Sequence, residues 1–235
     1  MPTAPLKPVE RPQALVEQVY RALRAQLRSG AIDAGAALQE VQLAGQLGVS
    51  RTPVREAMAR LASEGLLASH RRSFTVPALT RQDVDDIYEV RFLIEPAAFA
   101  SIAPLAADAA LRAPIGAALA RAAAAHRDGD SDAFREANAS YRAAWLALVR
   151  NARLVRVVEL YADHMQHIRA LTLGDARVRT IVLRGLERMT AALAAGDGDA
   201  AAAAMNDLLG HARQAFIEAM GLADKPAARR RSRRR

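Results

Sequence analysis

Two arginines four residues apart give the first indication of chemistry in this chain. They lie in "SRTPVREAMARLASEGLL", residues 50–67. On a helix, a four-residue spacing places Arg51 and Arg55 on one face. A guanidinium can donate two hydrogen bonds to phosphate or to guanine O6 and N7. Ser50 and Thr52 add hydroxyl donors beside the positive end of the same helix. The stretch predicts a helix end that binds an anion.

A simpler interpretation of these side chains is also open. Arg55 could pair with Glu56 or Glu17, and Arg51 could be an ordinary solvated residue. The two interpretations differ in what surrounds the helix, because an anion-binding helix needs a scaffold that presents its first turn.

The flanking sequence supplies such a scaffold. Apolar spacings of three and four predict a helix over 14–29, a short helix over 41–47 and a third over 51–64, with Gly48 as a helix stop and Ser50 as an N-cap. Residues 67–79 then alternate like two short strands around a basic turn. This order predicts a winged helix-turn-helix of three helices and a two-stranded wing, whose third helix enters the DNA major groove.

The distribution of charge agrees with a DNA-binding N-terminal part. The whole chain has a formal net charge of +8. Residues 1–78 carry 10 Lys/Arg and 6 Asp/Glu, a net charge of +4, and residues 79–221 carry 16 and 18, a net charge of −2. Residues 222–235 carry 7 and 1, a net charge of +6. The two ends are therefore expected to meet polyanions.

The middle of the chain is predicted to be helical. From residue 81 to about 221 the apolar spacing is that of five or six helices, with breaks at "APIG" (113–116), "RDGDSD", "RN", "LGDA" and "AAGDGDA". Aromatic residues make up 4% of the chain, and alanine dominates its apolar content. The expected fold class is mainly α: the winged helix-turn-helix followed by an all-helical bundle.

Composition also bounds the cellular setting. The chain has no cysteine, which rules out disulfides and thiolate metal sites. The N-terminus lacks the apolar core of a signal peptide, and no apolar run reaches the roughly 18 residues of a membrane span. We expect a cytoplasmic protein with no membrane partner.

Three stretches together resemble the GntR family of bacterial transcription regulators, in the FadR subfamily whose effector domain is called FCD. They are "LQEVQLAGQLGVSRTPVREAMARLASEGLL", the wing "RRSFTVPAL" and "RQDVDDIYEVRFLIEPAAFA". The resemblance covers about residues 14–221. It implies a homodimer on a pseudo-palindromic double-stranded operator, and repression is the usual mode of the family.

The resemblance also implies which residues contact the operator. Ser50, Arg51, Thr52 and Arg55 would contact it in the major groove, and the wing, with Arg71, Arg72 and Ser73, would reach the minor groove. Ser73 stands where the family usually has glycine, so the wing tip is less able to adopt a positive φ.

Relatives in this subfamily often hold a divalent metal at four positions of the helical domain. By resemblance these positions are Asn138, Arg142, Leu186 and Leu208. A guanidinium has no lone pair for a cation and leucine has no ligand atom, so three of the four ligands are lost. We therefore expect no metal and no other cofactor.

Of the histidines in the helical part, His164, His167 and His211 remain as candidate metal ligands. Satisfied or solvent-facing roles are expected for them, although a relocated metal site stays open.

The altered metal site suggests a different ligand chemistry. Arg142 shares a helix face with Asn138 and is flanked in sequence by Phe134, Tyr141 and Trp145, so it is predicted to bind the carboxylate or phosphate of an anionic metabolite. Arg91 lies in an apolar helical seam and needs a partner there. That partner could be the ligand or an internal ion pair with Glu95 or another helix.

The sequence thus predicts three segments. Residues 1–78 form a DNA-binding winged helix-turn-helix, 79–221 an all-helical effector-binding and dimerisation domain, and 222–235 a disordered Arg-rich tail. The leading hypothesis is an effector-controlled, sequence-specific transcription regulator without enzymatic activity. An architectural, nonspecific DNA-binding protein is the alternative. An enzyme in the helical domain is disfavoured, because the sequence has no nucleophile–base pair or phosphate loop.

Overall fold

A computed structural model describes residues 13–29, 31–32, 35–70, 73–164, 169 and 172–221. The chain divides into two compact units, Met1–Ala78 and Leu79–Arg235. Each unit is described by itself. No helix in the described ranges is long and apolar enough to cross a membrane.

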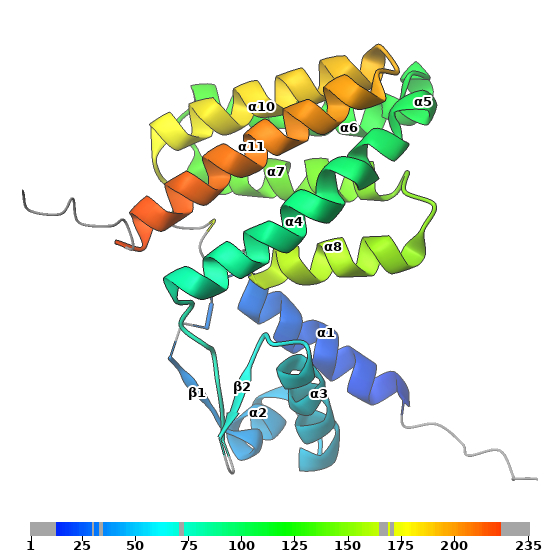
Figure 1. Ribbon diagram of the computed structural model, residues 1–235. Coiled ribbons are helices and arrows are strands. Elements are labelled where there is room, and N and C mark those ends of the chain that lie inside the picture. The colour runs from blue at the N-terminus through cyan, green and yellow to red at the C-terminus, as the bar shows by residue number, and fades with distance from the viewer. Residues whose placement is uncertain are drawn as a thin grey trace, which may run out of the picture. The chain divides into compact units, whose positions relative to one another are not determined.

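The first unit combines three helices with a small antiparallel sheet (Figure 1). Its helices are α1 (Gln13–Ser29), α2 (Glu40–Leu47) and α3 (Arg51–Ser63). The strands β1 (Ala37–Leu38), β2 (Ala68–His70) and β3 (Ser73–Thr75) pair in the order β1-β3-β2. The winged helix-turn-helix architecture is confirmed, but the sheet has three strands rather than two. The connector before α2 supplies the extra strand, with Leu38 paired to Phe74.

The turn between α2 and α3 forms as the sequence predicts. Gly48 ends α2 in the left-handed conformation at φ 65°, which an L side chain rarely adopts. Ser50 is the N-cap of α3 by position, although its side chain makes no capping hydrogen bond to this helix. The hydroxyl of Ser50 is thus not used by α3.

The apolar side of α3 forms the core of the first unit. Val54, Met58 and Leu61 have no exposed surface and pack with apolar residues of α1. The guanidinium of Arg60 lies over the ring of Tyr20, 3.7 Å from its centroid. Burial of one face of α3 leaves the opposite face, with Arg51 and Arg55, toward solvent.

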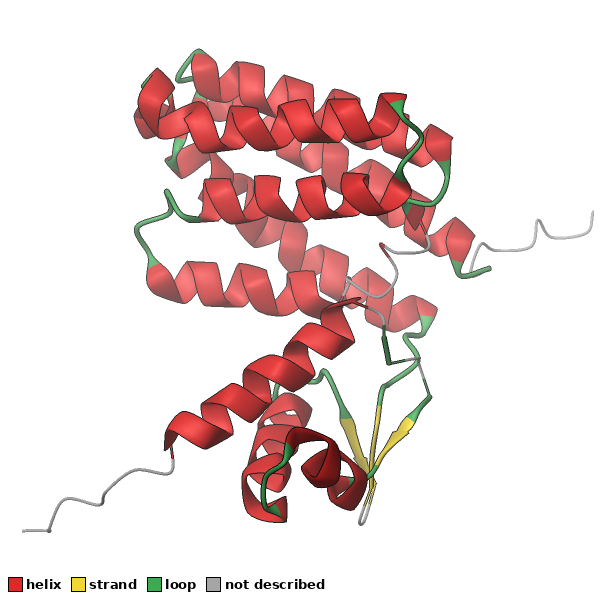
Figure 2. Ribbon diagram, turned by 180° about the vertical axis from the view of Figure 1, so that it is seen from behind, coloured by secondary structure: helices red, strands yellow, loops and turns green. Residues whose placement is uncertain are grey.

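The second unit is helical throughout its described residues (Figure 2). Its helices are α4 (Arg81–Ser101), α5 (Ala103–Ala106), α6 (Ala109–Arg127), α7 (Ser131–Leu146), α8 (Ala152–His164), α10 (Ala176–Ala194) and α11 (Gly198–Ala219). Helices α10 and α11 lie side by side, and α11 also packs along α4 (Figure 1). The all-helical prediction is confirmed.

One predicted helix break is wrong. The "APIG" stretch lies inside α6, where Pro114 is accommodated within a continuous helix. The chain instead breaks at 107–108, just ahead of α6, where the Asp108 side chain accepts a hydrogen bond from the backbone N–H of Ala110. An aspartate N-cap stabilises a helix start, so this boundary lies at Asp108 rather than at the proline.

Helices α10 and α11 pack closely against each other at Gly185. A Cβ atom built on Gly185 would lie 2.8 Å from Cδ1 of Leu208, so this glycine permits a near approach of the helices. Elsewhere in the bundle, Trp145 packs edge-on against Phe99 with ring centroids 5.4 Å apart. Helices α4, α7, α10 and α11 together surround a cavity.

Candidate nucleic-acid interface and ligand pocket

The first turn of α3 presents a cluster of exposed donors. Ser50 and Thr52 are exposed, and the side chains of Arg51 and Arg55 retain 59% and 62% of their accessible surface. The backbone N–H groups of a first helical turn have no intrahelical acceptor, and they give the same end a partial positive charge. The surface is therefore suited to phosphate oxygens and base edges.

A single carboxylate orients both arginines. Oε1 of Glu40 accepts a hydrogen bond from Nε of Arg55 at 3.0 Å, and Oε2 accepts from Nη2 of Arg55 at 3.1 Å and from Nη2 of Arg51 at 3.2 Å. These bonds, that from Arg55 above all, hold the pKa of Glu40 below its ordinary value. Glu40 therefore stays ionised at neutral pH and holds the guanidiniums of Arg51 and Arg55 next to each other.

The simpler interpretation of these ion pairs named the wrong partner. Arg55 pairs with Glu40 rather than with Glu56 or Glu17. Glu17 instead accepts from Arg60 at 2.8 Å and from Arg21 at 2.9 Å. Glu40 is the first residue of α2 and contacts α3 across the turn between the two helices. It lies 11 residues before Arg51 and 15 before Arg55, and no helical periodicity in the sequence indicates these pairs.

The wing is described in part. Ser73 begins β3 and pairs with His70 in the antiparallel register. Arg71 and Arg72, which the sequence analysis assigns to the minor groove, lie outside the described residues, as does the Arg-rich tail.

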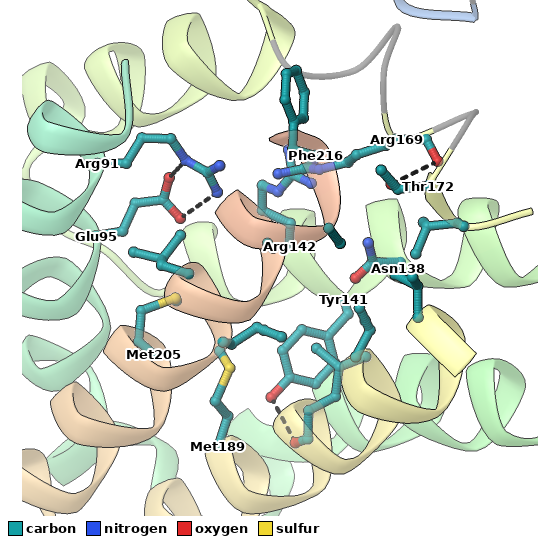
Figure 3. Close-up of a pocket in the computed structure, with 18 of the residues that line it drawn as sticks. Arg91, Glu95, Asn138, Tyr141, Arg142, Arg169, Thr172, Met189, Met205 and Phe216 are labelled. Carbon is teal, nitrogen blue, oxygen red and sulfur yellow. Dashed lines mark hydrogen bonds and ion pairs between the residues drawn. The ribbon is translucent and has the colours of Figure 1, made fainter. Parts of the chain in front are cut away.

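The second unit contains a pocket with about 730 Å³ of empty space, its open mouth included (Figure 3). Arg91 of α4 and four residues of α7, Asn138, Tyr141, Arg142 and Trp145, line it. All five proposed effector residues therefore face one cavity. Phe134 does not line the pocket. It is buried in the core with its ring against His126.

The predicted internal partner of Arg91 is present. Nε of Arg91 donates to Oε1 of Glu95 at 2.5 Å, and Nη2 donates to Oε2 at 3.4 Å. Each residue is 3% exposed. Burial is the largest single effect and would lower the pKa of Arg91, but the negative charge and hydrogen bonds of Glu95 together with the hydroxyl of Tyr88 raise this pKa, so Arg91 stays charged. Since Arg91 also lines the pocket, the ion pair does not exclude contact with a ligand.

Tyr141 links the pocket wall to α10. Its hydroxyl lies 2.9 Å from Oγ1 of Thr190 and donates to the carbonyl oxygen of Leu186 at 3.3 Å. Burial raises the pKa of Tyr141 to about 12, so the phenol stays protonated. Tyr141 thus has a structural role beside its place in the pocket wall.

The four positions at which the resemblance places a metal in relatives meet in this pocket. Asn138, Arg142, Leu186 and Leu208 all line it. Within the described residues, no three His, Cys, Asp or Glu side chains are grouped so that they could hold a metal ion. His211 is exposed, with Nδ1 2.8 Å from the carbonyl oxygen of Asp207, and His164 lies against the ring of Tyr161. His167 lies outside the described residues.

The structure adds pocket residues that the sequence analysis did not identify. They are Tyr88 and Glu95 of α4, Arg169 and Thr172, and the apolar side chains of α10 and α11. Tyr88 and Glu95 lie three residues before and four residues after Arg91, on the same face of the helix. The spacing that drew attention to Arg91 could therefore have identified them as pocket residues. Nothing local in the sequence places Arg169 at the same cavity.

Two family models match this chain. The model described as bacterial regulatory proteins, gntR family, matches residues 15–76, and the FCD domain model matches residues 86–211.

The curated relatives align mainly with the first unit. An HTH-type transcriptional regulator of Bacillus subtilis, YdhC, is 40% identical over 88 residues, which are 37% of this chain and 39% of that protein. The gluconate operon transcriptional repressor of Bacillus subtilis is 42% identical over 77 residues, 33% of this chain and 32% of the repressor. These alignments span less than two thirds of either relative's length.

A solved structure resembles nearly the whole chain. Escherichia coli McbR/YncC superposes with a TM-score of 0.75 at 27% identity, over 88% of this chain and 98% of that one. With an FCD model over more than half of its length and a gntR model over the helix-turn-helix, this chain belongs to the gntR family of bacterial regulatory proteins, in the group that carries an FCD domain.

Proposed function

We propose that this chain is a sequence-specific DNA-binding transcription regulator whose operator affinity is controlled by a small anionic metabolite. The observation that carries the proposal is the first turn of α3, where two exposed arginines are oriented by one largely buried carboxylate. An arginine held in place can donate two hydrogen bonds to guanine, which a freely moving surface charge does less well.

The DNA contacts follow from this placement. Arg51 and Arg55 read base edges in the major groove, and Ser50 and Thr52 donate to phosphates. The wing, with Arg71, Arg72 and Ser73, adds minor-groove contact. A homodimer applies two such surfaces to the half-sites of a pseudo-palindrome.

The metabolite binds in the pocket of the helical unit, and no metal takes part. Arg142 binds its anionic group in place of the family metal, beside the amide of Asn138. Tyr141 and Trp145 form the adjoining wall, and Arg91 lies across the cavity. Support comes from the convergence of these side chains on one cavity.

Repression is the favoured mode, in keeping with relatives whose names describe repressors. Control by a ligand requires that it bind one geometry of the dimer more tightly than another, because the differential affinity alone shifts the equilibrium.

Selection of bound DNA from a random duplex pool tests the proposal. The full chain is compared with the double variant Arg51→Ala/Arg55→Ala and with Arg121→Ala/Arg127→Ala. The control pair is exposed on α6 and removes the same two charges. Wild type and control should enrich one pseudo-palindrome. Removal of one arginine–guanine pairing costs about 1–3 kcal/mol, so the double variant should lose this enrichment.

Two results would contradict the proposal. One is an unchanged enriched sequence in the Arg51→Ala/Arg55→Ala variant. The other is equal competition by random and selected DNA for the wild-type chain, which is the behaviour of an architectural protein.

A further inference from the structure

The face of α4 that points away from the core changes character along the helix. Its first half is polar, with Gln82, Asp86 and Glu89 exposed. Its second half is apolar. Leu93 is 72% exposed, the largest value among the large apolar side chains of the described residues, and Ala97 is exposed one turn later. A helix that packs on one side only is polar on the other, so the apolar half indicates a surface that another molecule covers.

Helix α8 extends this apolar surface. It packs against α4 and runs alongside it in the opposite direction (Figure 1). Val157 of α8 is 40% exposed, and Leu160, three residues later on the same side of the helix, is half-buried. We refer to Leu93, Ala97, Val157 and Leu160, with the exposed charged residues beside them, as the α4–α8 face.

The two helices carry opposite charges in their first halves. Asp86 and Glu89 lie in the first half of α4, and Arg153 and Arg156 lie in the first half of α8, all four exposed. Because the helices are antiparallel, the basic start of α8 lies toward the end of α4 and away from the acidic start of α4 (Figure 1). The α4–α8 face is therefore acidic at one end, basic at the other and apolar between them.

A second copy of the chain is complementary to this face. Around a twofold axis close to Leu93, α4 packs antiparallel against α4 of the partner subunit, and the two leucines meet. The start of the partner's α4 then lies over the end of α4, beside the start of α8. This arrangement brings the two acidic residues of each α4 to Arg153 and Arg156 of the other subunit, so that opposite charges meet twice.

We propose that a second copy of this chain docks on the α4–α8 face, with the two α4 helices antiparallel. The inference rests on the proposed function, in which the chain acts as a homodimer, and it assigns the surface and the orientation of that dimer. Leu93 then lies at the interface, while Arg91 of the same helix lines the ligand pocket. One helix thus serves both the dimer contact and the pocket wall.

Sedimentation velocity of the full chain over a series of concentrations tests the surface. The wild type should be a dimer, and Leu93→Asp should raise the dimer dissociation constant about 100-fold or more, because the twofold axis loses two apolar contacts and buries two charges. Leu93→Ala, which removes apolar atoms only, should raise it about tenfold. Ile181→Asp is the matched control, since Ile181 is a partly exposed apolar residue of α10, and should leave it unchanged.

Charge reversal tests the orientation. The variants Asp86→Arg/Glu89→Arg and Arg153→Glu/Arg156→Glu should each dimerise about tenfold or more weakly at low salt, because like charges then meet across the interface. An equimolar mixture of the two should restore dimers, since every contact in the heterodimer is again between opposite charges. The exposed pair of α6, changed as Arg121→Glu/Arg127→Glu, should neither weaken its own dimer nor restore that of the acidic-to-basic variant.

The outcomes separate this inference from the proposed function. A wild-type dimer that is unaffected by Leu93→Asp overturns the docking surface and leaves the homodimer in place. A dimer that is weakened by Leu93→Asp but not restored in the charge-reversed mixture overturns the antiparallel orientation. A wild-type chain that stays monomeric, alone and on its selected operator, overturns the homodimer and the inference with it. Circular dichroism of each variant establishes that a lost dimer is not a lost fold.

Discussion

Replacement of Glu40 by glutamine should reduce discrimination between operator and unrelated DNA. Glu40 is the shared acceptor of Arg51 and Arg55, and glutamine keeps its size while removing its charge. An arginine side chain carries about 2 kcal/mol of rotamer entropy, part of which is lost whenever it is fixed against a base. Glu40 restricts both side chains before DNA arrives, so less entropy remains to be lost on binding.

The size of the effect follows from the exposure of the two arginines. Both arginine side chains are more than half exposed, so each ion pair with Glu40 is weak. Replacement of Glu40 should therefore lower the specific-to-nonspecific affinity ratio by about 2- to 30-fold at each half-site. Affinity for unrelated DNA should rise slightly, because a negative charge is removed near phosphate.

Fluorescence anisotropy at one fixed salt concentration, with the selected operator and a scrambled duplex, measures this ratio. Glu56→Gln is the matched control, since Glu56 is exposed on α3 and its replacement changes the net charge equally. The control should raise both affinities and keep their ratio. If Glu40→Gln and Glu56→Gln keep the same ratio, Glu40 does not orient the reading arginines and the reasoning is refuted.

Three further predictions concern stability and the tail. Tyr141→Phe should lower the free energy of unfolding by about 1 kcal/mol and the melting temperature by a few degrees, because a buried hydrogen-bonded hydroxyl is lost. Differential scanning calorimetry measures the change, and the control variant Tyr161→Phe should have little effect on the melting temperature. The hydrogen bond from Arg213 lowers the pKa of Asp85 below its ordinary value of 3.8. Ionised Asp85 therefore stabilises the folded state above pH 3.8, and this contribution is lost as the pH falls through the folded-state pKa of Asp85. Asp85→Asn should therefore flatten acid unfolding followed by circular dichroism, and an unchanged profile would contradict this. Deletion of 222–235, which lie outside the described residues, should reduce the log–log salt slope of DNA binding by about 0.9 for each phosphate that the tail neutralises, and an equal slope would show that the tail does not bind DNA.

The first unit was readily predicted because its signals are local. Apolar spacings of three and four marked α3, and the buried Val54, Met58 and Leu61 confirm that face. Gly48 marked the end of α2 because a left-handed residue there favours glycine. The third strand was missed because Ala37–Leu38 is too short to alternate, and its pairing with β3 is a long-range event.

The helical unit was predicted in class but less well in its boundaries. Proline was taken to mark a break at "APIG", yet α6 continues through Pro114, which is itself exposed, while Ile115 and Ala118 of the same helix are buried in the core. The ligand pocket was inferred from Arg142 and Arg91 on separate helices. Its further members, Glu95 and Arg169 among them, could be assigned once the helices were assembled.

By itself the sequence determined most of the elements and the exposed arginine face of α3, because each depends on residue type and on spacing within one helix. Tertiary structure decided which charges meet. It gave Arg51 and Arg55 their common partner Glu40 and left Nη1 of Arg91 without an acceptor among the described residues. Ion-pair partners are chosen by proximity in space, and the chain positions of Glu40 and Arg55 do not reveal that proximity.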